Sequence, residues 1–205
     1  MNITERQDMS RTEAVQRIEQ AIEKQSTKLD LSGLELKEVP PEIGKCTHLI
    51  NLDLSKNQIT SIPEAIGLMS SIKWLNLNNN QITSIPPAIG QMSSLIGLNL
   101  DNNQITSIPK EIEHLSNLDC LLLKGNKITL IPKKAIEQLS KLKLIWLDIS
   151  RNPVIKVSIT PGSSGFPPEL GQLEKLQVVN GVIEDGTYNH RDYQRPKQPQ
   201  WSYRG

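Results

Sequence analysis

A short pattern of hydrophobic and polar positions recurs along the chain at a fixed interval. The segment "NQITSIP" begins at Asn57 and returns at Asn80 and Asn103, and an edited copy, "NKITLIP", begins at Asn126, so that consecutive copies stand 23 residues apart. Around each copy leucines alternate with polar residues, as in "LINLDLSKNQI" from Leu49. A fixed period of this length is typical of a solenoid, in which each repeat forms one coil.

The alternation inside each copy predicts one short strand per coil. Leu52 and Leu54 would point to one face of the strand, while Asn51 and Asp53 would point to the other. The same template recurs in segments that begin at Ile72, Leu95, Leu118 and Leu144. We therefore expect an α/β solenoid, an arc with about seven short parallel strands on its concave face and helical or irregular segments on its convex face.

One asparagine follows each strand, and its place in the repeat predicts a structural role. After the strand the backbone must turn, and its polar groups become buried between coils, where water cannot reach them. An amide side chain offers both donors and an acceptor, so a column of asparagines could satisfy these groups. The column predicted to form this internal ladder is Asn57, Asn80, Asn103, Asn126 and Asn152. The first coil has Leu34 at this position, where only a cap precedes it and fewer backbone groups need a partner.

Between strands the chain is expected to return along the outside of the coil. The Ile62–Pro63 pair would start an extended or helical return segment, with Ile66 and Met69 turned inward at helical spacing. Gly67 is expected to end that segment.

The two ends of the chain depart from the repeat, as the ends of a solenoid must. Residues 1–26 are predicted to form an N-terminal capping helix, which "SRTE" from Ser10 to Glu13 would begin as a capping box. The solenoid would then span residues 27–181. Within it, we expect a longer outer helix over residues 133–143 and a loop at "TPGSSG". Residues 182–205 are polar and non-periodic, which predicts a C-terminal cap or a flexible tail.

The template "IPxxIGxxxxLxxLxLxxNxI" resembles the leucine-rich repeat, in the 23-residue class found in Ras-suppressor and Scribble-type proteins and in the repeat domains of bacterial Roco proteins. The resemblance runs roughly from Lys28 to Gly181. It implies a protein-binding module whose concave sheet grips a partner, with small GTPase signalling as one family theme. No G-x-x-x-x-G-K-[ST] motif is present, so the Roco GTPase domain is not expected.

The outward-facing strand positions form the candidate partner-binding surface, because they vary from coil to coil while the leucine and asparagine columns do not. Trp74 and Trp146 stand out, since a tryptophan on a solvated sheet is a natural contact anchor. The alternative is that both rings merely cover neighbouring side chains, with Gly97 leaving room. The candidate surface consists of Asn51, Asp53, Trp74, Asn76, Asn78, Asn99, Asp101, Cys120, Leu122, Lys124, Trp146, Asp148 and Arg151.

Composition narrows the class of partner and the compartment. A formal net charge of +1 provides no field for nucleic acid or acidic membranes, and no apolar run is long enough to span a bilayer. Cys46 is expected to point inward and Cys120 to lie on the concave face, too far apart for a disulfide. With no apolar leader either, we expect a cytoplasmic protein that needs no cofactor or metal.

Catalysis is disfavoured. Asp30 and Asp53 are expected on adjacent strands about 4.8 Å apart, a separation that could suit paired carboxylates. No nucleophile, base and orienting group converge, however. The leading hypothesis is a non-enzymatic module that binds a partner protein through the concave face, and a small GTPase is possible by resemblance. The alternative is a scaffold or regulatory subunit that contacts its partner through the C-terminal tail.

Overall fold

A computed structural model describes residues 3–131, 146–149, 151–153, 156–157 and 177–178 of the chain. A single long helix, α1 (Ile3–Glu23), precedes the coils. The strands of the main sheet are β1 (Lys28–Asp30), β2 (Asn51–Asp53), β3 (Trp74–Asn76), β4 (Gly97–Asn99), β5 (Cys120–Leu122), β7 (Trp146–Asp148) and β9 (Gln177–Val178). The return segments contain the 3-10 helices η1 (Pro41–Lys45), η2 (Glu64–Leu68), η3 (Pro87–Gln91) and η4 (Lys110–His114).

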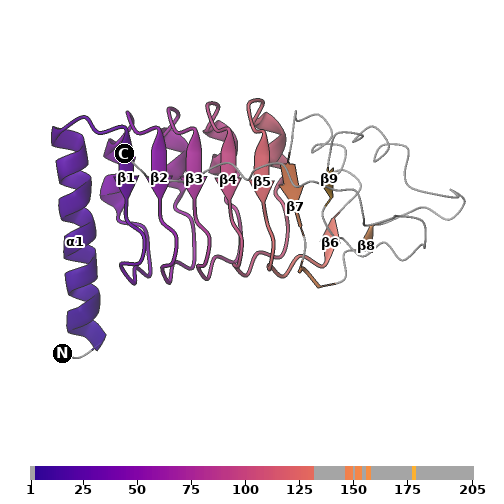
Figure 1. The fold of residues 1–205 in the computed structure, drawn as a ribbon, viewed down its shortest axis with the longest axis horizontal. Coiled ribbons are helices and arrows are strands. Elements are labelled where there is room, and N and C mark those ends of the chain that lie inside the picture. Colours follow the sequence, from indigo (N-terminus) through magenta and orange to yellow (C-terminus); the bar gives the residue numbers. More distant parts are fainter. Residues whose placement is uncertain (1–2, 132–145, 150, 154–155, 158–176, 179–205) are drawn as a thin grey trace, which may run out of the picture.

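The strands form one parallel sheet, which confirms the predicted solenoid. Its seven strands follow the order of the sequence, β1-β2-β3-β4-β5-β7-β9, so each coil lies directly beside the next (Figure 1). Equivalent residues pair across the strands, as Leu52 pairs with Leu75 and Leu75 with Leu98. A second, two-stranded sheet joins β6 (Leu130–Ile131) to β8 (Lys156–Val157).

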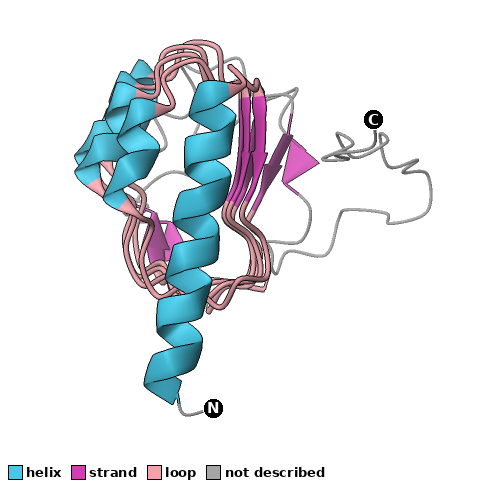
Figure 2. Ribbon diagram, turned by 90° about the vertical axis from the view of Figure 1, so that its left-hand side faces the viewer, coloured by secondary structure: helices cyan, strands magenta, loops and turns pink. Residues whose placement is uncertain are grey.

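The core lies between the sheet and the 3-10 helices, as the end-on view of Figure 2 shows. It is largely aliphatic, because the coils of β1 to β5 each contribute two leucines, one in the strand and one just after it, and the return segments with η1 to η4 each contribute an inward pair. Ile66 and Met69 are fully buried, as predicted. None of the helices in the described residues is long and apolar enough to cross a membrane.

The asparagine ladder is present and connects each coil to the one before it. Asn80 Nδ2 donates to Leu77 O of its own coil (3.1 Å) and to Leu54 O of the preceding coil (2.9 Å). Its Oδ1 accepts the Ile59 N–H at 3.0 Å. The same three contacts recur at Asn57, Asn103, Asn126 and Asn152. Each amide therefore satisfies buried backbone groups in two coils at once.

The first coil needs no ladder asparagine of its own. Asn57, from the second coil, accepts the Leu36 N–H and donates to Leu31 O of the first coil. Leu34, which occupies the ladder position there, instead packs against the hydrophobic core. The backbone groups of Leu31 and Leu36 in the first coil are therefore satisfied by the asparagine of the second coil.

Helix α1 closes the N-terminal end of the solenoid, but its predicted start is wrong. Ala14, Ile18 and Ala21 are buried against the first coil. Ser10, expected at the helix start, lies inside the helix, where its Oγ donates to Arg6 O at 3.0 Å. The physical reason is that no glycine or proline interrupts residues 3–9, so the helix continues and the serine bonds back by four residues.

Gly67 does not end its return segment, contrary to the prediction. It lies within η2, and a Cβ there would approach Ala88 O of the next coil to 2.9 Å. Gly90, in η3, is similarly placed, with Glu111 O at 2.7 Å. These glycines are needed because successive 3-10 helices approach each other closely.

The longer outer helix, the "TPGSSG" loop and the tail from residue 182 onward lie outside the described residues. The predicted domain boundaries at 26, 27, 181 and 182 therefore stay predictions.

The close approach of the 3-10 helices predicts a difference between two glycines. Gly90→Ala should lower the free energy of unfolding by about 1–3 kcal/mol, because its methyl group would collide with a backbone oxygen. Gly44→Ala should change it by no more than about 0.5 kcal/mol, since the nearest atom to a Cβ there is 3.7 Å away. Urea titrations compare the two variants, and equal midpoints would contradict this packing.

The ladder predicts a second difference, between neighbouring amides. Asn80→Ala should cost about 1–3 kcal/mol, because it leaves the buried Ile59 N–H without its acceptor and removes one of the two amide donors to the Leu54 carbonyl. Gln81→Ala, at the next and exposed position, should be nearly neutral. If thermal melts of the two variants coincide, the asparagine does not serve the buried backbone.

Candidate functional site

The register of the sheet brings the outward strand residues into columns. Asn51, Trp74, Gly97 and Cys120 lie directly opposite one another on β2, β3, β4 and β5. Trp146 continues this column on β7. Trp74 is half-buried, with Gly97 beside it on β4. The column predicted to carry the aromatic anchors therefore exists, and Trp74 is its largest side chain in the part of the chain where burial is described.

The next column has a structural role that was not predicted from the sequence. Asp53 Oδ1 accepts the Ser55 N–H at 2.8 Å, two residues further along the chain. Equivalent bonds run from the backbone N–H groups of Ser32, Asn78 and Asp101 to the side-chain oxygens of Asp30, Asn76 and Asn99. We call Asp30, Asp53, Asn76 and Asn99 the strand-end row. Each of its members satisfies the backbone where its strand ends.

Leu122 interrupts the strand-end row, and the preceding coil compensates. The leucine side chain has no oxygen that could accept a hydrogen bond from the backbone N–H of Lys124. Instead, Asp101 Oδ1 accepts that N–H at 2.8 Å across the two coils. Asp101 therefore stabilises the turn of a neighbouring coil, although it was predicted only as a partner contact.

Burial divides the candidate surface in two. Several side chains expected to be exposed are buried, namely Asp53 (7%), Asn76 (5%), Asn99 (5%), Cys120 (3%) and Leu122 (5%). Half-buried or exposed positions are Asn51, Trp74, Asn78, Asp101, Lys124, Asp148 and Arg151. The buried polar members already have the hydrogen bonds described above. The half-buried and exposed group is therefore the part of the candidate surface open to a partner.

Three carboxylates, Asp101, Asp119 and Asp148, act on the electrostatics of the sheet around β5. Burial raises the pKa of Asp101 to about 6, and the Asp148 carboxylate adds to the rise, while the Lys124 N–H and ammonium oppose it. Burial, together with Asp101, Asp119 and Asp148, raises the pKa of the Cys120 thiol to about 12. The thiol is therefore protonated at neutral pH and is a poor nucleophile. Cys120 and Leu122 form a small apolar cluster separate from the main core.

The residues considered for catalysis have structural partners. Asp30 and Asp53 do lie on adjacent strands in register. Asp53 also accepts the Asn76 amide through its second oxygen at 3.0 Å. Cys46 is buried, as expected, and Cys120 is buried as well; both are free cysteines. Among the described residues, no group of three histidine, cysteine or acidic side chains could hold a metal ion.

The backbone conformation where the chain leaves each strand was not predicted from the sequence. The residue before each ladder position takes a left-handed backbone conformation, in the column Gly33, Lys56, Asn79, Asn102, Gly125 and Arg151. Glycine and asparagine tolerate this conformation, so their recurrence at the period could have revealed it. The exposed amides of this column are connected, because Asn102 Nδ2 donates to Asn79 Oδ1 and Asn79 Nδ2 donates to Asn78 Oδ1. Lys56 and Arg151 also have this conformation, but neither residue type favours it, so the sequence did not indicate it at these two positions.

The raised pKa of Asp101 predicts a pH-dependent stability. The native state binds this proton more tightly than the unfolded state, whose carboxyl has a pKa near 3.8, so stability falls as the pH rises from about 4 to about 6. Asp101→Asn removes this loss and keeps an oxygen for the Lys124 N–H. Its free energy of unfolding, relative to wild type, should therefore be higher at pH 8 than at pH 4 by about 1–2 kcal/mol, allowing for partial exposure. Denaturant titrations at the two pH values measure this, and a difference independent of pH would refute the burial of an ionised Asp101.

Comparison with known proteins adds to this geometry. A family model described as a leucine-rich repeat region matches residues 68–194, and another described as a leucine rich repeat matches residues 27–82. No curated protein matches the chain.

Two solved structures illustrate the similarity. A leucine-rich repeat protein of Leptospira interrogans is 30% identical, with a TM-score of 0.57, over 78% of this chain and 50% of that one. The ectodomain of the membrane receptor kinase GASSHO1/SCHENGEN3 from Arabidopsis thaliana, solved in complex with Casparian strip integrity factor 2, is 32% identical, with a TM-score of 0.54. That match covers 68% of this chain and 19% of the ectodomain, so the chain spans half or less of either relative.

Proposed function

This chain belongs to the leucine-rich repeat family, and from that premise we propose that it binds a partner protein on the concave face of its sheet, with Trp74 as the anchor. Leucine-rich repeat domains generally mediate protein–protein interaction, and the family is typically not enzymatic. The Arabidopsis neighbour supports the proposal, because it carries a bound factor on a fold of this kind.

The observation that carries the proposal is the position of Trp74 beside Gly97. The two residues lie opposite each other on β3 and β4, so the indole ring has a neighbour without a side chain. A partner side chain that packs over Gly97 would contact the ring, and a tryptophan contact of this sort contributes much of an interface's energy. Asn51 flanks the ring on the other side, on β2.

The surroundings of Trp74 provide a polar rim. Asn78 is half-buried beyond the end of the same strand, and Asp101 and Lys124 follow on the next two coils. Arg151 is exposed at the exit of β7. Interfaces commonly combine an aromatic centre with such a rim of hydrogen-bonding and charged groups. The rim carries both signs of charge, which favours a partner of mixed charge over a nucleic acid.

The resemblance to Ras-suppressor proteins favours a partner in small GTPase signalling in the cytoplasm. In this proposal the chain acts as a scaffold without catalytic activity. The supporting observation is that Asp30 and Asp53, the carboxylates considered for catalysis, accept backbone N–H groups.

A second candidate is contact through residues 182–205, with the repeats as scaffold. The burial of Asp53, Asn76, Asn99 and Leu122 favours it, because a partner would reach less of the sheet than the sequence suggests. The two candidates differ in whether Trp74 or the tail determines binding.

Substitution at Trp74 tests the proposal. The full chain is immobilised to capture proteins from an extract of its source cells, and the affinity of each captured protein is then measured by calorimetry. Trp74→Ala should weaken that affinity by about 1–4 kcal/mol, because the anchor is lost. Thr83→Ala, which alters an exposed side chain in the return segment, should leave it unchanged. Circular dichroism of both variants checks that they are folded.

A third variant, truncated after Gly181, distinguishes the two candidates. If Trp74→Ala binds as wild type does and only the truncation abolishes capture, the concave-face proposal is wrong and the tail makes the contact.

A further inference from the structure

A strip of apolar residues crosses the concave face of the sheet. Trp74, Gly97 and Cys120 lie side by side on β3, β4 and β5, and Trp146 continues the row on β7. Leu122 lies next to Cys120 on the same side of β5, and the two form an apolar cluster apart from the main core. We call Trp74, Gly97, Cys120 and Leu122 the concave strip. Because these residues face away from the core, their apolar character indicates a contact with another segment or molecule.

The row that contains the strip is least accessible near β5. On β1 it begins with the exposed Lys28, and on β2 and β3 it continues with the half-buried Asn51 and Trp74. Gly97 on β4 is buried, and Cys120 on β5 is only 3% exposed. An occupant that approaches from the C-terminal coils fits this gradient better than one that approaches from the N-terminal end.

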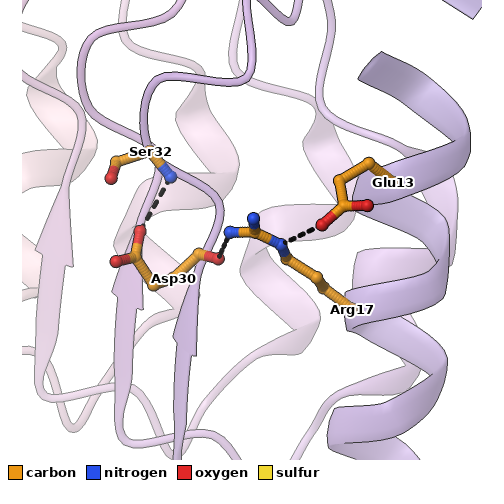
Figure 3. Close-up of polar contacts among 4 residues, drawn as sticks. All are labelled: Glu13, Arg17, Asp30 and Ser32. Atoms are coloured by element: carbon orange, nitrogen blue, oxygen red, sulfur yellow. Dashed lines mark hydrogen bonds and ion pairs between the residues drawn. The ribbon is translucent and has the colours of Figure 1, made fainter. Parts of the chain in front are cut away.

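The N-terminal helix is not that occupant. Arg17 of α1 donates through Nη1 to Asp30 O at 3.0 Å and through Nε to Glu13 Oε1 at 2.8 Å, which helps to hold the helix on the end of the stack (Figure 3). In the end-on view of Figure 2, α1 lies on the side of the sheet that faces the 3-10 helices, opposite the concave face. The outward-facing Lys28 and Asp30 accordingly stay exposed.

The tail, residues 182–205, is tethered close to the strip. Strand β9 pairs with β7 at the end of the sheet, and 27 residues follow it, from 179 to 205. A chain of that length can reach about 90 Å when extended. Four strand spacings, about 19 Å in all, separate β9 from β3. The tail is therefore long enough to cross the whole strip.

The composition of the tail suits an apolar strip. The tail holds four of the chain's seven tryptophan, tyrosine and phenylalanine residues, namely Tyr188, Tyr193, Trp201 and Tyr203. The core positions of the repeats are filled by aliphatic side chains and do not provide a place for them. Aromatic side chains bury a large apolar area, and Gly97 leaves room for one beside the Trp74 ring.

Charge favours the same pairing. Three carboxylates act on the Cys120 thiol, namely those of Asp101, Asp119 and Asp148. The ammonium of Lys124 opposes their effect at Asp101. Residues 188–205 carry four arginine and lysine residues but a single aspartate or glutamate. A basic segment rich in aromatic residues is thus complementary to an apolar strip with carboxylates beside it.

We propose that residues 188–205 of this chain bind its own concave strip, with an aromatic side chain over Gly97 beside Trp74. Two segments joined by a short linker meet at an effective concentration on the order of 1 mM, so even a weak contact between them is occupied most of the time. The partner proposed above would then have to displace this segment. Only that consequence rests on the proposed function.

The first experiment uses the two free cysteines as reporters. Cys120 belongs to the strip, whereas Cys46 is fully buried in the main core and reports unfolding. Labelling of the full chain with N-ethylmaleimide, followed by mass spectrometry, measures both rates. Replacement of the four tail aromatic residues by serine should speed labelling of Cys120 at least tenfold and leave the rate at Cys46 unchanged. A control variant, with serine at four polar tail positions, should change neither rate; these positions are Asn189, Gln194, Gln198 and Gln200.

Three results of this experiment would overturn the proposal. If Cys120 in the aromatic variant is labelled at the wild-type rate, the tail does not cover the strip. If the rate at Cys46 rises in the same proportion, the variant has lost its fold rather than its cover. If the rate at Cys120 of the wild-type chain falls as the chain is concentrated, the occupant is a second copy.

The second experiment changes the strip and observes the tail. Trp74→Ala should speed trypsin cleavage of the full chain after Arg191 and Lys197 at least fivefold, because a bound tail resists the protease. Thr83→Ala, at an exposed position of a return segment, should leave these rates unchanged. Equal cleavage rates for Trp74→Ala and wild type would overturn the proposal. Neither experiment includes a partner protein, so a failure of partner binding at Trp74 is distinguishable from a failure of this inference.

Discussion

The fold depends on a buried amide that satisfies two coils at once. A short strand followed by a tight turn leaves backbone N–H and C=O groups inside a stack of coils, and each unpaired group would cost about 1–3 kcal/mol. The ladder asparagines remove this cost with one side chain per coil, as Asn80 does for Leu54, Ile59 and Leu77. Because each amide reaches backward to the preceding coil, it also sets the spacing and register of the coils. The parallel sheet and the aliphatic core follow from that register.

The same requirement extends into the concave face. The strand-end row satisfies the backbone where β1 to β4 end, and Asp101 does so after β5, where Leu122 cannot. The residues nearest the candidate binding surface therefore contribute to folding as well. This dual role leaves Trp74 and the members of the polar rim other than Asp101 as the positions where recognition could vary without loss of the fold. The hydrogen bond from the Lys124 N–H also offsets part of the cost of burying the Asp101 charge close to Asp148.

Periodicity determined how much could be predicted from the sequence. The strands, the inward leucines and the asparagine ladder were predicted correctly, because each recurs at the same position and has a local physical reason. The predicted start of α1 was wrong because the segment before the "SRTE" motif contains no glycine or proline, so the helix begins earlier and continues through the motif. The role of Gly67 depends on how closely η2 and η3 approach, and that distance is not encoded in either segment alone. The hydrogen bond from Arg17 to Asp30 O was not predicted, because the two residues become neighbours only when α1 packs on the first coil.

Native-state hydrogen exchange of the isoleucine amides tests the ladder most directly. The N–H groups of Ile59, Ile82 and Ile105 have asparagine side-chain oxygens as their acceptors, at 3.0 Å in each case. We expect these amides to be protected as strongly as the amides of Leu54 and Leu77, which donate to Asn76 O and Asn99 O of the next coil, and to exchange only when the solenoid opens as a whole. Exchange of the three isoleucine amides at the rate of an unstructured peptide, while the leucine amides stay protected, would contradict it.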